Sequence, residues 1–308
     1  HPGAIAEDPH IRLWAERVAG LCTNTGQLVL GPQTDPSRYP YHLLRKLACL
    51  LKDGRYLSVA DLRERQVARG MDRILQFTAG QAWAADVEAV EPDDAVGLRV
   101  YPMNERLRQW QAPTIRAGKG FDRAVGRGGW AEADEYLMVI GVRSGGKSLP
   151  NVGTLAAYER FGQRLITSDL VPLYPRSASP WRHSRATVSI GGLGAGMSEG
   201  AEVLVQRAVA GGHLFSFEIN AAGHHRWFRS LYWKPSAYVL IVDRILVQGE
   251  ATWPWSLGVN WRCAGRVLGI EDDLATLAFA DPEVAGRFHV QVAGGLRLHA
   301  ETSSYPVL

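Results

Sequence analysis

The stretch HRWFRSLYWKPSAYVLIVDRI, residues 225–245, decides the fold class. Trp227 and Trp233 stand where apolar and polar neighbours alternate, and residues 238–242 form a short run of β-branched and aromatic side chains. Both patterns are typical of strands, and a wide sheet uses such rings as cross-strand pairs. Aromatic rings can also stack on sugars, but packing in a core is the expected role of each single tryptophan.

Runs of the same kind recur along the chain after Gly80. They are short, β-branched or aromatic, and separated by Gly, Pro, Asn or Asp, and they cover residues 97–100, 136–142, 164–167, 187–190, 215–219 and 287–292. Many short strands with few helices between them indicate a sandwich or barrel. Residues 81–308 are therefore predicted to form a large antiparallel β-sandwich.

The first third of the chain has helical signals instead. Three apolar-periodic stretches follow one another: one from the Asp-Pro pair at 8–9 to Gly20, one from the Asp-Pro pair at 35–36 to Gly54, and one over residues 58–75. Helices of this length joined by Gly or Pro turns pack as hairpins. The predicted fold class is thus α+β and mainly β, with a helical segment over residues 1–80.

The composition argues against several classes of protein. Lys and Arg total 34 against 31 Asp and Glu, so the net charge of +3 gives no electrostatic reason to expect nucleic acid or a membrane as a partner. The three cysteines are widely spaced, which predicts buried thiols rather than disulfides or a Cys-x-x-Cys site. No apolar run approaches the roughly 18 residues of a membrane span. Both ends of the chain look cut, so a piece of a longer protein is expected.

A nucleotide-binding motif occurs between Gly141 and Ser148, where GVRSGGKS matches the Walker A pattern after an apolar run. In such a protein Lys147 would contact phosphates and Asp243 could be a metal ligand. A P-loop opens into a helix on a parallel sheet, whereas Pro, Asn and Gly follow here at once. We therefore expect residues 136–140 and 164–167 to be antiparallel strands of one sheet, with Lys147 in the turn between them. P-loop nucleotide binding stays an alternative.

An ordered set of segments runs through most of the chain: GPQTDPSRYPYHLLRKLACLLKDGRYL (31–57), FDRAVGRGGWAEADEYLMVIG (121–141), GGKSLPNVGTLAAYERFGQRLITSD (145–169), RATVSIGG (185–192) and HRWFRSLYWKPSAYVLIVDRI (225–245). This order resembles that of the heparinase II/III-like polysaccharide lyases, with the first segment similar to the last helices of their α/α toroid. The resemblance implies cleavage of an acidic, uronic-acid polysaccharide by β-elimination. It also implies a periplasmic or secreted protein.

A lyase of this kind removes the C5 proton of a uronic acid and expels the C4 oxygen, so it needs a base, an acid and a group that neutralises the carboxylate. The segment RYPYH (38–42) offers these residue types at the first turn of a predicted helix, whose N-terminus favours an anionic sugar. We predict three catalytic residues, Tyr39, Tyr41 and His42. The predicted substrate-binding cations are Arg38, Arg143, Lys147 and Arg185.

The sequence departs from the family at several of these positions. Lys147 and Leu149 stand where the family tends to have histidines, Asn151 where it has Asp, and Arg185-Ala186 where it has His-Asn. Cations in place of imidazoles keep charge neutralisation and lose proton transfer, so turnover is expected to be weak or absent. A non-catalytic carbohydrate-binding or structural β-sandwich is therefore the second interpretation.

The resemblance also bears on metal binding. Asp169 stands at the family's Asp position, and His183 lies two residues before the place of a ligand histidine. Two ligands are too few for a closed zinc site. We therefore expect that no cofactor is required, with a structural zinc at Asp169 and His183 as the alternative.

Overall fold

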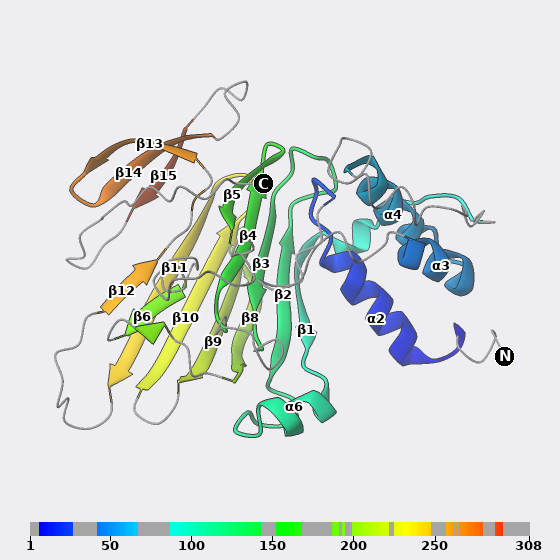
Figure 1. The fold of residues 1–308 in the computed structure, drawn as a ribbon, viewed down its shortest axis with the longest axis horizontal. Helices are drawn as coiled ribbons and strands as arrows, with labels where there is room; N and C mark the ends of the chain where they lie inside the picture. The colour runs from blue at the N-terminus through cyan, green and yellow to red at the C-terminus, as the bar shows by residue number, and fades with distance from the viewer. Residues whose placement is uncertain are drawn as a thin grey trace, which may run out of the picture.

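The computed structural model describes residues 6–26, 42–66, 87–142, 152–167, 187–190, 193–194, 199–221, 225–247, 257–260, 263, 265–279 and 287–291. Three layers stand side by side in this part of the chain: helices, a five-stranded sheet and a four-stranded sheet (Figure 1). The two sheets pack face to face as a sandwich, and the helices cover the other face of the five-stranded sheet. The predicted α+β, mainly β class is confirmed.

The helical layer consists of α2 (Pro9–Gly20), α3 (His42–Leu51) and α4 (Gly54–Gln66). The Asp8 carboxylate caps α2 by accepting a hydrogen bond from the His10 amide at 2.8 Å, as the Asp-Pro signal predicts. Helix α4 begins at Gly54, earlier than the predicted residue 58, because Asp53 accepts from the Arg55 amide at 3.1 Å and so supplies a cap there. The predicted helix start at residues 35–36 lies outside the described residues.

The five-stranded sheet contains β1 (Gly97–Pro102), β2 (Phe121–Arg127), β3 (Tyr136–Ile140), β4 (Leu155–Arg160) and β5 (Gln163–Thr167), in that order. All neighbouring pairs are antiparallel. The prediction that β3 and β5 belong to one sheet is confirmed. The prediction that they pair as antiparallel neighbours is wrong, because β4 lies between them and makes them run in the same direction.

A tight turn explains how β4 returns to β5. Phe161 and Gly162 both have positive φ, 57° and 70°, as a two-residue hairpin turn requires. Strand β4 escaped the sequence analysis because Ala156 and Ala157 carry none of the β-branched or aromatic signal of a strand. Both are fully buried, so packing rather than intrinsic preference places them in the sheet.

The four-stranded sheet contains β8 (Ala201–Val209), β9 (Gly212–Ala221), β10 (His225–Lys234) and β11 (Tyr238–Val247), in the order β11-β10-β9-β8. Trp227 and Trp233 are fully buried on its inner face and pack with residues of the five-stranded sheet such as Phe121 and Leu137. Their predicted role in core packing is confirmed. Burial of side chains of this size contributes roughly 1.5–3 kcal/mol each to folding.

Strand β3 joins the two cores. Tyr136, Met138 and Ile140 face the helical layer, whereas Leu137 and Val139 face the four-stranded sheet. All five are buried, which explains why this antiparallel strand is a continuous apolar run instead of an alternating one. The five-stranded sheet is therefore the central layer of the molecule.

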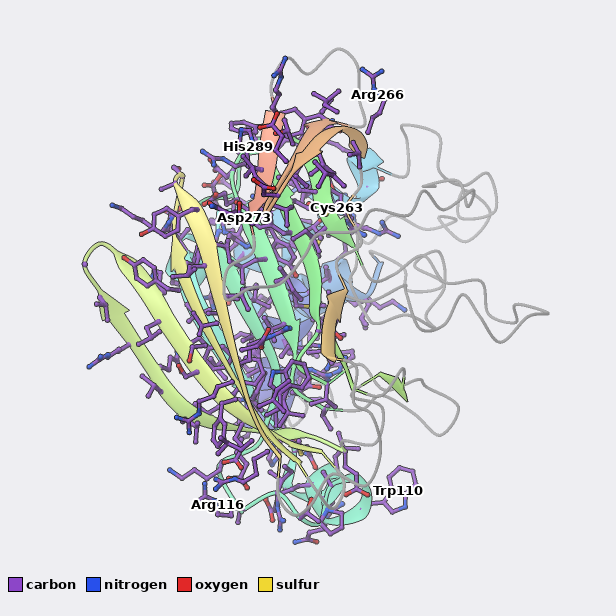
Figure 2. All side chains as sticks on the ribbon, turned by 90° about the vertical axis from the view of Figure 1, so that its left-hand side faces the viewer. Trp110, Arg116, Cys263, Arg266, Asp273 and His289 are labelled. Carbon is purple, nitrogen blue, oxygen red and sulfur yellow. The ribbon has the colours of Figure 1, made fainter. Side chains whose placement is uncertain are left out.

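Smaller elements complete the described part. The helix α6 (Glu105–Gln111) and the 3-10 helix η3 (Asp93–Ala95) flank β1 in the sequence. One small sheet has the order β12 (Leu257–Asn260), β6 (Thr187–Ile190), β7 (Leu193–Gly194), and another the order β13 (Gly265–Glu271), β14 (Leu274–Phe279), β15 (Arg287–Gln291). Figure 2 shows Trp110 and Arg116 at one end of the sandwich, with Arg266 and His289 of the last sheet at the other. None of the described helices is both long and apolar enough to cross a membrane.

The topology opposes the nucleotide-binding alternative. Strand β3, which precedes the Walker-like motif, pairs antiparallel with β4, the next described strand, rather than with a parallel neighbour. Asp243 belongs to β11 of the other sheet, where its carboxylate accepts from Arg229 at 2.8 Å and from the indole of Trp227 at 2.7 Å. Asp243 is thus engaged in an ion pair within the sandwich core. Lys147 and its motif neighbours from 143 to 150 lie outside the described residues.

Cys22 is fully buried, which confirms the predicted burial for one thiol. Cys49 and Cys263 are only half-buried, so the prediction of burial is wrong for these two.

Candidate functional site

Almost all of the residues predicted as the site lie outside the described part of the chain. His42 is placed as the first residue of α3, but only its backbone belongs to the described part. The other catalytic and substrate-binding candidates fall outside, as do the metal candidates: Arg38, Tyr39, Tyr41, Arg143, Lys147, Asp169, His183 and Arg185. These assignments stay predictions.

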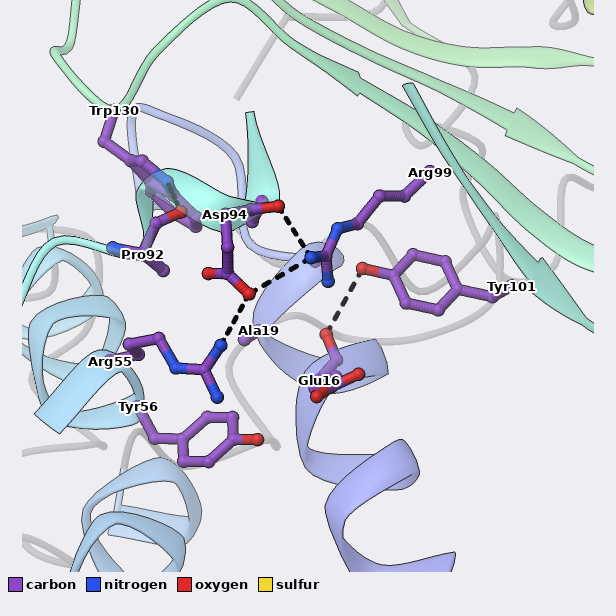
Figure 3. A pocket seen from close by; sticks show the side chains of 11 residues that line it. Glu16, Ala19, Arg55, Tyr56, Pro92, Asp94, Arg99, Tyr101 and Trp130 are labelled. Atoms are coloured by element: carbon purple, nitrogen blue, oxygen red, sulfur yellow. Dashed lines mark hydrogen bonds and ion pairs between the residues drawn. The ribbon is translucent and has the colours of Figure 1, made fainter. Parts of the chain in front are cut away.

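A narrow pocket lies between the helical layer and the five-stranded sheet (Figure 3). Its cavity is small, about 20 Å³, enough for about one water molecule, and it is partly open to solvent. We call it the seam pocket. It is lined by Glu16, Ala19 and Gly20 of α2, Arg55 and Tyr56 of α4, Pro92, Asp94 and Ala95 around η3, Arg99 and Tyr101 of β1, and Trp130.

Two arginines converge at this pocket. Arg55 donates from Nη1 to Asp94 Oδ2 at 2.6 Å, and Arg99 donates from Nη2 to the same oxygen at 3.2 Å. The other edge of Arg55 is held by Asp53, with its Nη2 at 2.7 Å from Oδ2. Hydrogen bonds from the Arg55 side chain hold the pKa of Asp53 below its ordinary value. The arginines are thus positioned by the carboxylates of Asp53, just before α4, and of Asp94 in η3.

Two tyrosines form the inner wall. Tyr101 donates its hydroxyl to the carbonyl of Glu16 at 3.3 Å, which ties β1 to the last turn of α2. Tyr56 is buried, and within the described part its hydroxyl has no hydrogen-bond partner. Burial, followed by the nearby Glu16 carboxylate, raises the pKa of Tyr56 to about 12, and burial raises the pKa of Tyr101 as well. Both hydroxyls stay protonated at neutral pH.

Trp130 forms the third wall and rests on a rigid support. Its indole nitrogen donates to the carbonyl of Pro92 at 2.9 Å, and the guanidinium of Arg127 lies 3.5 Å from the centre of its ring. Arg127 is buried and donates to Cys22 O and to the side-chain oxygen of Asn24 in the turn after α2. The aromatic wall is therefore fixed to both the sheet and the helical layer.

This arrangement can bind an acidic group but offers little for proton transfer. Guanidinium groups match the geometry of carboxylates and sulfates. The described lining contains no histidine, and raised tyrosine pKa values disfavour a tyrosinate base. Nor does the described part hold any group of three or more His, Cys, Asp and Glu side chains that could bind a metal. Binding, rather than catalysis, is the chemistry that these residues support.

The sequence analysis missed the residues of this pocket. Arg99 and Tyr101 are two apart on a strand, so they share one face, and this spacing was a usable signal. Arg55 and Tyr56 were part of the resembling segment 31–57 but were assigned no role. No local sequence pattern identifies Asp94 or Trp130 as pocket residues. They reach the pocket only because α2 and α4 pack against β1.

Comparison with known proteins finds similar structures but no similar sequences. No model of a protein family and no curated protein sequence matches the chain. Its structure matches a mutant heparan sulfate lyase, HepC, from Pedobacter heparinus with a TM-score of 0.58 and 11% identity over 86% of this chain and 37% of that one. It matches a heparinase III gene product with a TM-score of 0.57 and 12% identity over 84% of this chain and 35% of that one.

The chain spans about a third of the length of these two structures. At such low sequence identity the similarity concerns the fold alone. This shared fold agrees with the resemblance seen in the order of the sequence segments. The protein therefore has the helix-and-sandwich fold found in one part of the heparinase III and heparan sulfate lyase structures.

Proposed function

We propose that this chain is part of a polysaccharide lyase-like protein and that it binds acidic, uronic-acid polysaccharide at the seam between its helical layer and its sandwich. Two proteins that share its fold are named as a heparan sulfate lyase and a heparinase III, which supports a polysaccharide as the ligand. The resemblance in sequence adds a periplasmic or secreted location to the proposal.

One observation carries the location of the site. Arg55 of α4 and Arg99 of β1 come from different layers and point toward one carboxylate oxygen of Asp94 beside a pocket (Figure 3). Ligand sites favour such boundaries between structural units. Paired guanidinium groups bind carboxylate or sulfate through charge-assisted hydrogen bonds. The buried tyrosine and tryptophan side chains close the inner side of the pocket.

The proposed chemistry, where it occurs, is β-elimination. Tyr39, Tyr41 and His42 act as base and acid at the C5 proton and the C4 oxygen, while Arg38, Arg143, Lys147 and Arg185 neutralise the substrate carboxylate. Cations stand where the resembling family has imidazoles, so the carboxylate is neutralised but proton transfer is weak. Turnover is accordingly slow.

The test of catalysis is the absorbance of the unsaturated uronate product. The chain is incubated separately with heparan sulfate, alginate and chondroitin, and the variant Tyr39→Phe, Tyr41→Phe, His42→Ala is run beside it. We expect slow product formation that the triple variant abolishes. Robust turnover that survives the triple substitution would show that the chemistry lies elsewhere.

A non-catalytic carbohydrate-binding module is the second candidate function. It is favoured by the described lining of the seam pocket, which has cations and aromatic rings but no histidine. Binding of the same polysaccharides with no product at any enzyme concentration would select this candidate over the lyase.

A further inference from the structure

Asp94 is the residue on which the two arginines of the seam pocket converge. Its Oδ2 atom accepts hydrogen bonds from Arg55 and Arg99, and its side chain is 49% exposed (Figure 3). The two arginine side chains are more sheltered, at 29% and 32% exposed. A half-exposed carboxylate therefore faces two cations that are anchored in separate layers.

The Asp94 carboxylate determines the net charge of the pocket. Its lining contains the cations Arg55 and Arg99 and the anions Glu16 and Asp94, so the described lining is formally neutral. An incoming anion gains little attraction from a neutral site. It can bind both guanidiniums only if the Asp94 carboxylate leaves them.

A second feature of the pocket also indicates a ligand. Tyr56, which lines the same pocket, is 2% exposed, yet its hydroxyl has no hydrogen-bond partner in the described part of the chain. Buried hydroxyls are normally paired with protein or water. A polar ligand group would supply the partner that Tyr56 lacks.

We propose that the seam pocket takes one carboxylate of a uronic-acid sugar, and that this carboxylate displaces Asp94 from Arg55 and Arg99. This inference rests on the proposed function. It adds that the group recognised is the sugar carboxylate and that the Asp94 carboxylate competes with it. A carboxylate fits because a carboxylate is held there now. The pocket is narrow, so it accepts this substituent while the sugar ring stays outside.

The exchange is a rotation of the Asp94 side chain, during which Arg99 Nη2 keeps its hydrogen bond to the backbone carbonyl of Asp94 at 2.6 Å. The backbone around Asp94 is fixed by hydrogen bonds from Ala95 N to Pro92 O at 2.8 Å and from Val96 N to Asp93 O at 3.0 Å. The indole of Trp130 adds a bond to Pro92 O. Substituting Asp94 should therefore change ligand binding without unfolding η3.

The matched pair of variants is Asp94→Asn and Asp93→Asn, which remove the same charge from adjacent residues. Asp93 is exposed and, within the described residues, forms no ion pair with either arginine. Exposed ion pairs contribute at most about 1 kcal/mol, so relief of the competition should strengthen binding by up to about fivefold. Asp93→Asn should change the affinity by less than about twofold, because a distant surface charge is screened by salt.

Calorimetric titration with an alginate oligosaccharide, which carries carboxylates and no sulfate, makes the measurement. A neutral glucose oligosaccharide of equal length is the ligand control. We expect Asp94→Asn alone to tighten alginate binding, with no gain for the neutral sugar. The inference alone would be overturned if the unsubstituted chain binds alginate and Asp94→Asn leaves that affinity unchanged or weakens it. It would also be overturned if Asp93→Asn strengthens binding as much as Asp94→Asn does. Absence of alginate binding in every form would overturn the inference and the proposed function together.

Discussion

The guanidinium of Arg127 lies 3.5 Å from the centre of the Trp130 ring, with only 1% of Arg127 exposed. The same guanidinium donates to Cys22 O and to the side chain of Asn24. No carboxylate pairs with it directly among the described residues. A single buried cation thus connects the central sheet, the turn after α2 and the aromatic wall of the seam pocket.

Arg127→Met should lower the free energy of unfolding by about 2–4 kcal/mol, because it leaves the oxygens of Cys22 and Asn24 buried without their donor. Urea unfolding followed by tryptophan fluorescence measures this. Arg106→Met is the control, since Arg106 is exposed on α6, and it should cost less than about 0.5 kcal/mol. Equal effects of the two variants would mean that the buried network contributes nothing.

Asp243→Asn should lower the free energy of unfolding by about 3–5 kcal/mol, because it removes the carboxylate charge that is paired with the buried guanidinium of Arg229. Glu218→Gln on β9 is the matched control: its partner Arg226 is 46% exposed, and such a pair contributes about 1 kcal/mol or less. Chemical denaturation of both variants separates the two cases. A loss below about 1 kcal/mol for Asp243→Asn would contradict its structural role.

Alkaline pH should destabilise the protein through buried protonated groups. Burial raises the pKa of Cys22 to about 12 and also raises the pKa of Tyr136. The unfolded chain releases these protons at about pH 8.5 and 10, and the folded chain retains them, so stability is full below pH 8.5 and falls as pH rises toward 12.

The slope is at most about 1.4 kcal/mol per pH unit for each such group. Urea unfolding at pH 7, 9 and 10 measures it, and Cys22→Ala should be less sensitive to pH between 9 and 10 than the unsubstituted chain. Identical pH dependence of the two would show that Cys22 ionises equally in the folded and unfolded states.

Neither ATP with magnesium nor a metal chelator should shift the thermal midpoint by more than about 1 °C. A ligand that binds only the folded state raises the midpoint by mass action, and removal of a structural metal lowers it. The antiparallel pairing of β3 with β4 opposes a P-loop, and Asp169 with His183 would be an incomplete zinc site. Stoichiometric zinc bound at those two residues, or stabilisation by ATP, would refute this prediction.

Much of the fold could be predicted because its signals are local. The Asp8 cap and Pro9 marked α2, and the alternation around Trp227 and Trp233 marked a sheet with a buried aromatic face. Strand β4 could not be predicted, since Ala156 and Ala157 become strand residues only by burial between two layers. The division into residues 1–80 and 81–308 stays a prediction.

The candidate site was harder to predict for a physical reason. Arg55, Asp94 and Arg99 are brought together by α4, η3 and β1, and no pattern within one segment encodes that meeting. Base and acid residue types stand close together in residues 38–42, so the site was predicted there. The role of the pocket's arginines depends instead on the packing of helices against a strand.

Calorimetric binding of a heparan sulfate oligosaccharide tests the central claim, that acidic polysaccharide binds at the seam through Arg55 and Arg99. The variant Arg55→Gln, Arg99→Gln is compared with Arg106→Gln, Arg207→Gln, which removes equal charge from exposed residues elsewhere. We expect the seam variant to bind at least about tenfold more weakly than the unsubstituted chain, a loss of roughly 1.4 kcal/mol or more. The control should stay within about twofold, and the affinity should fall as salt rises. Equal affinity of the two double variants would contradict the account.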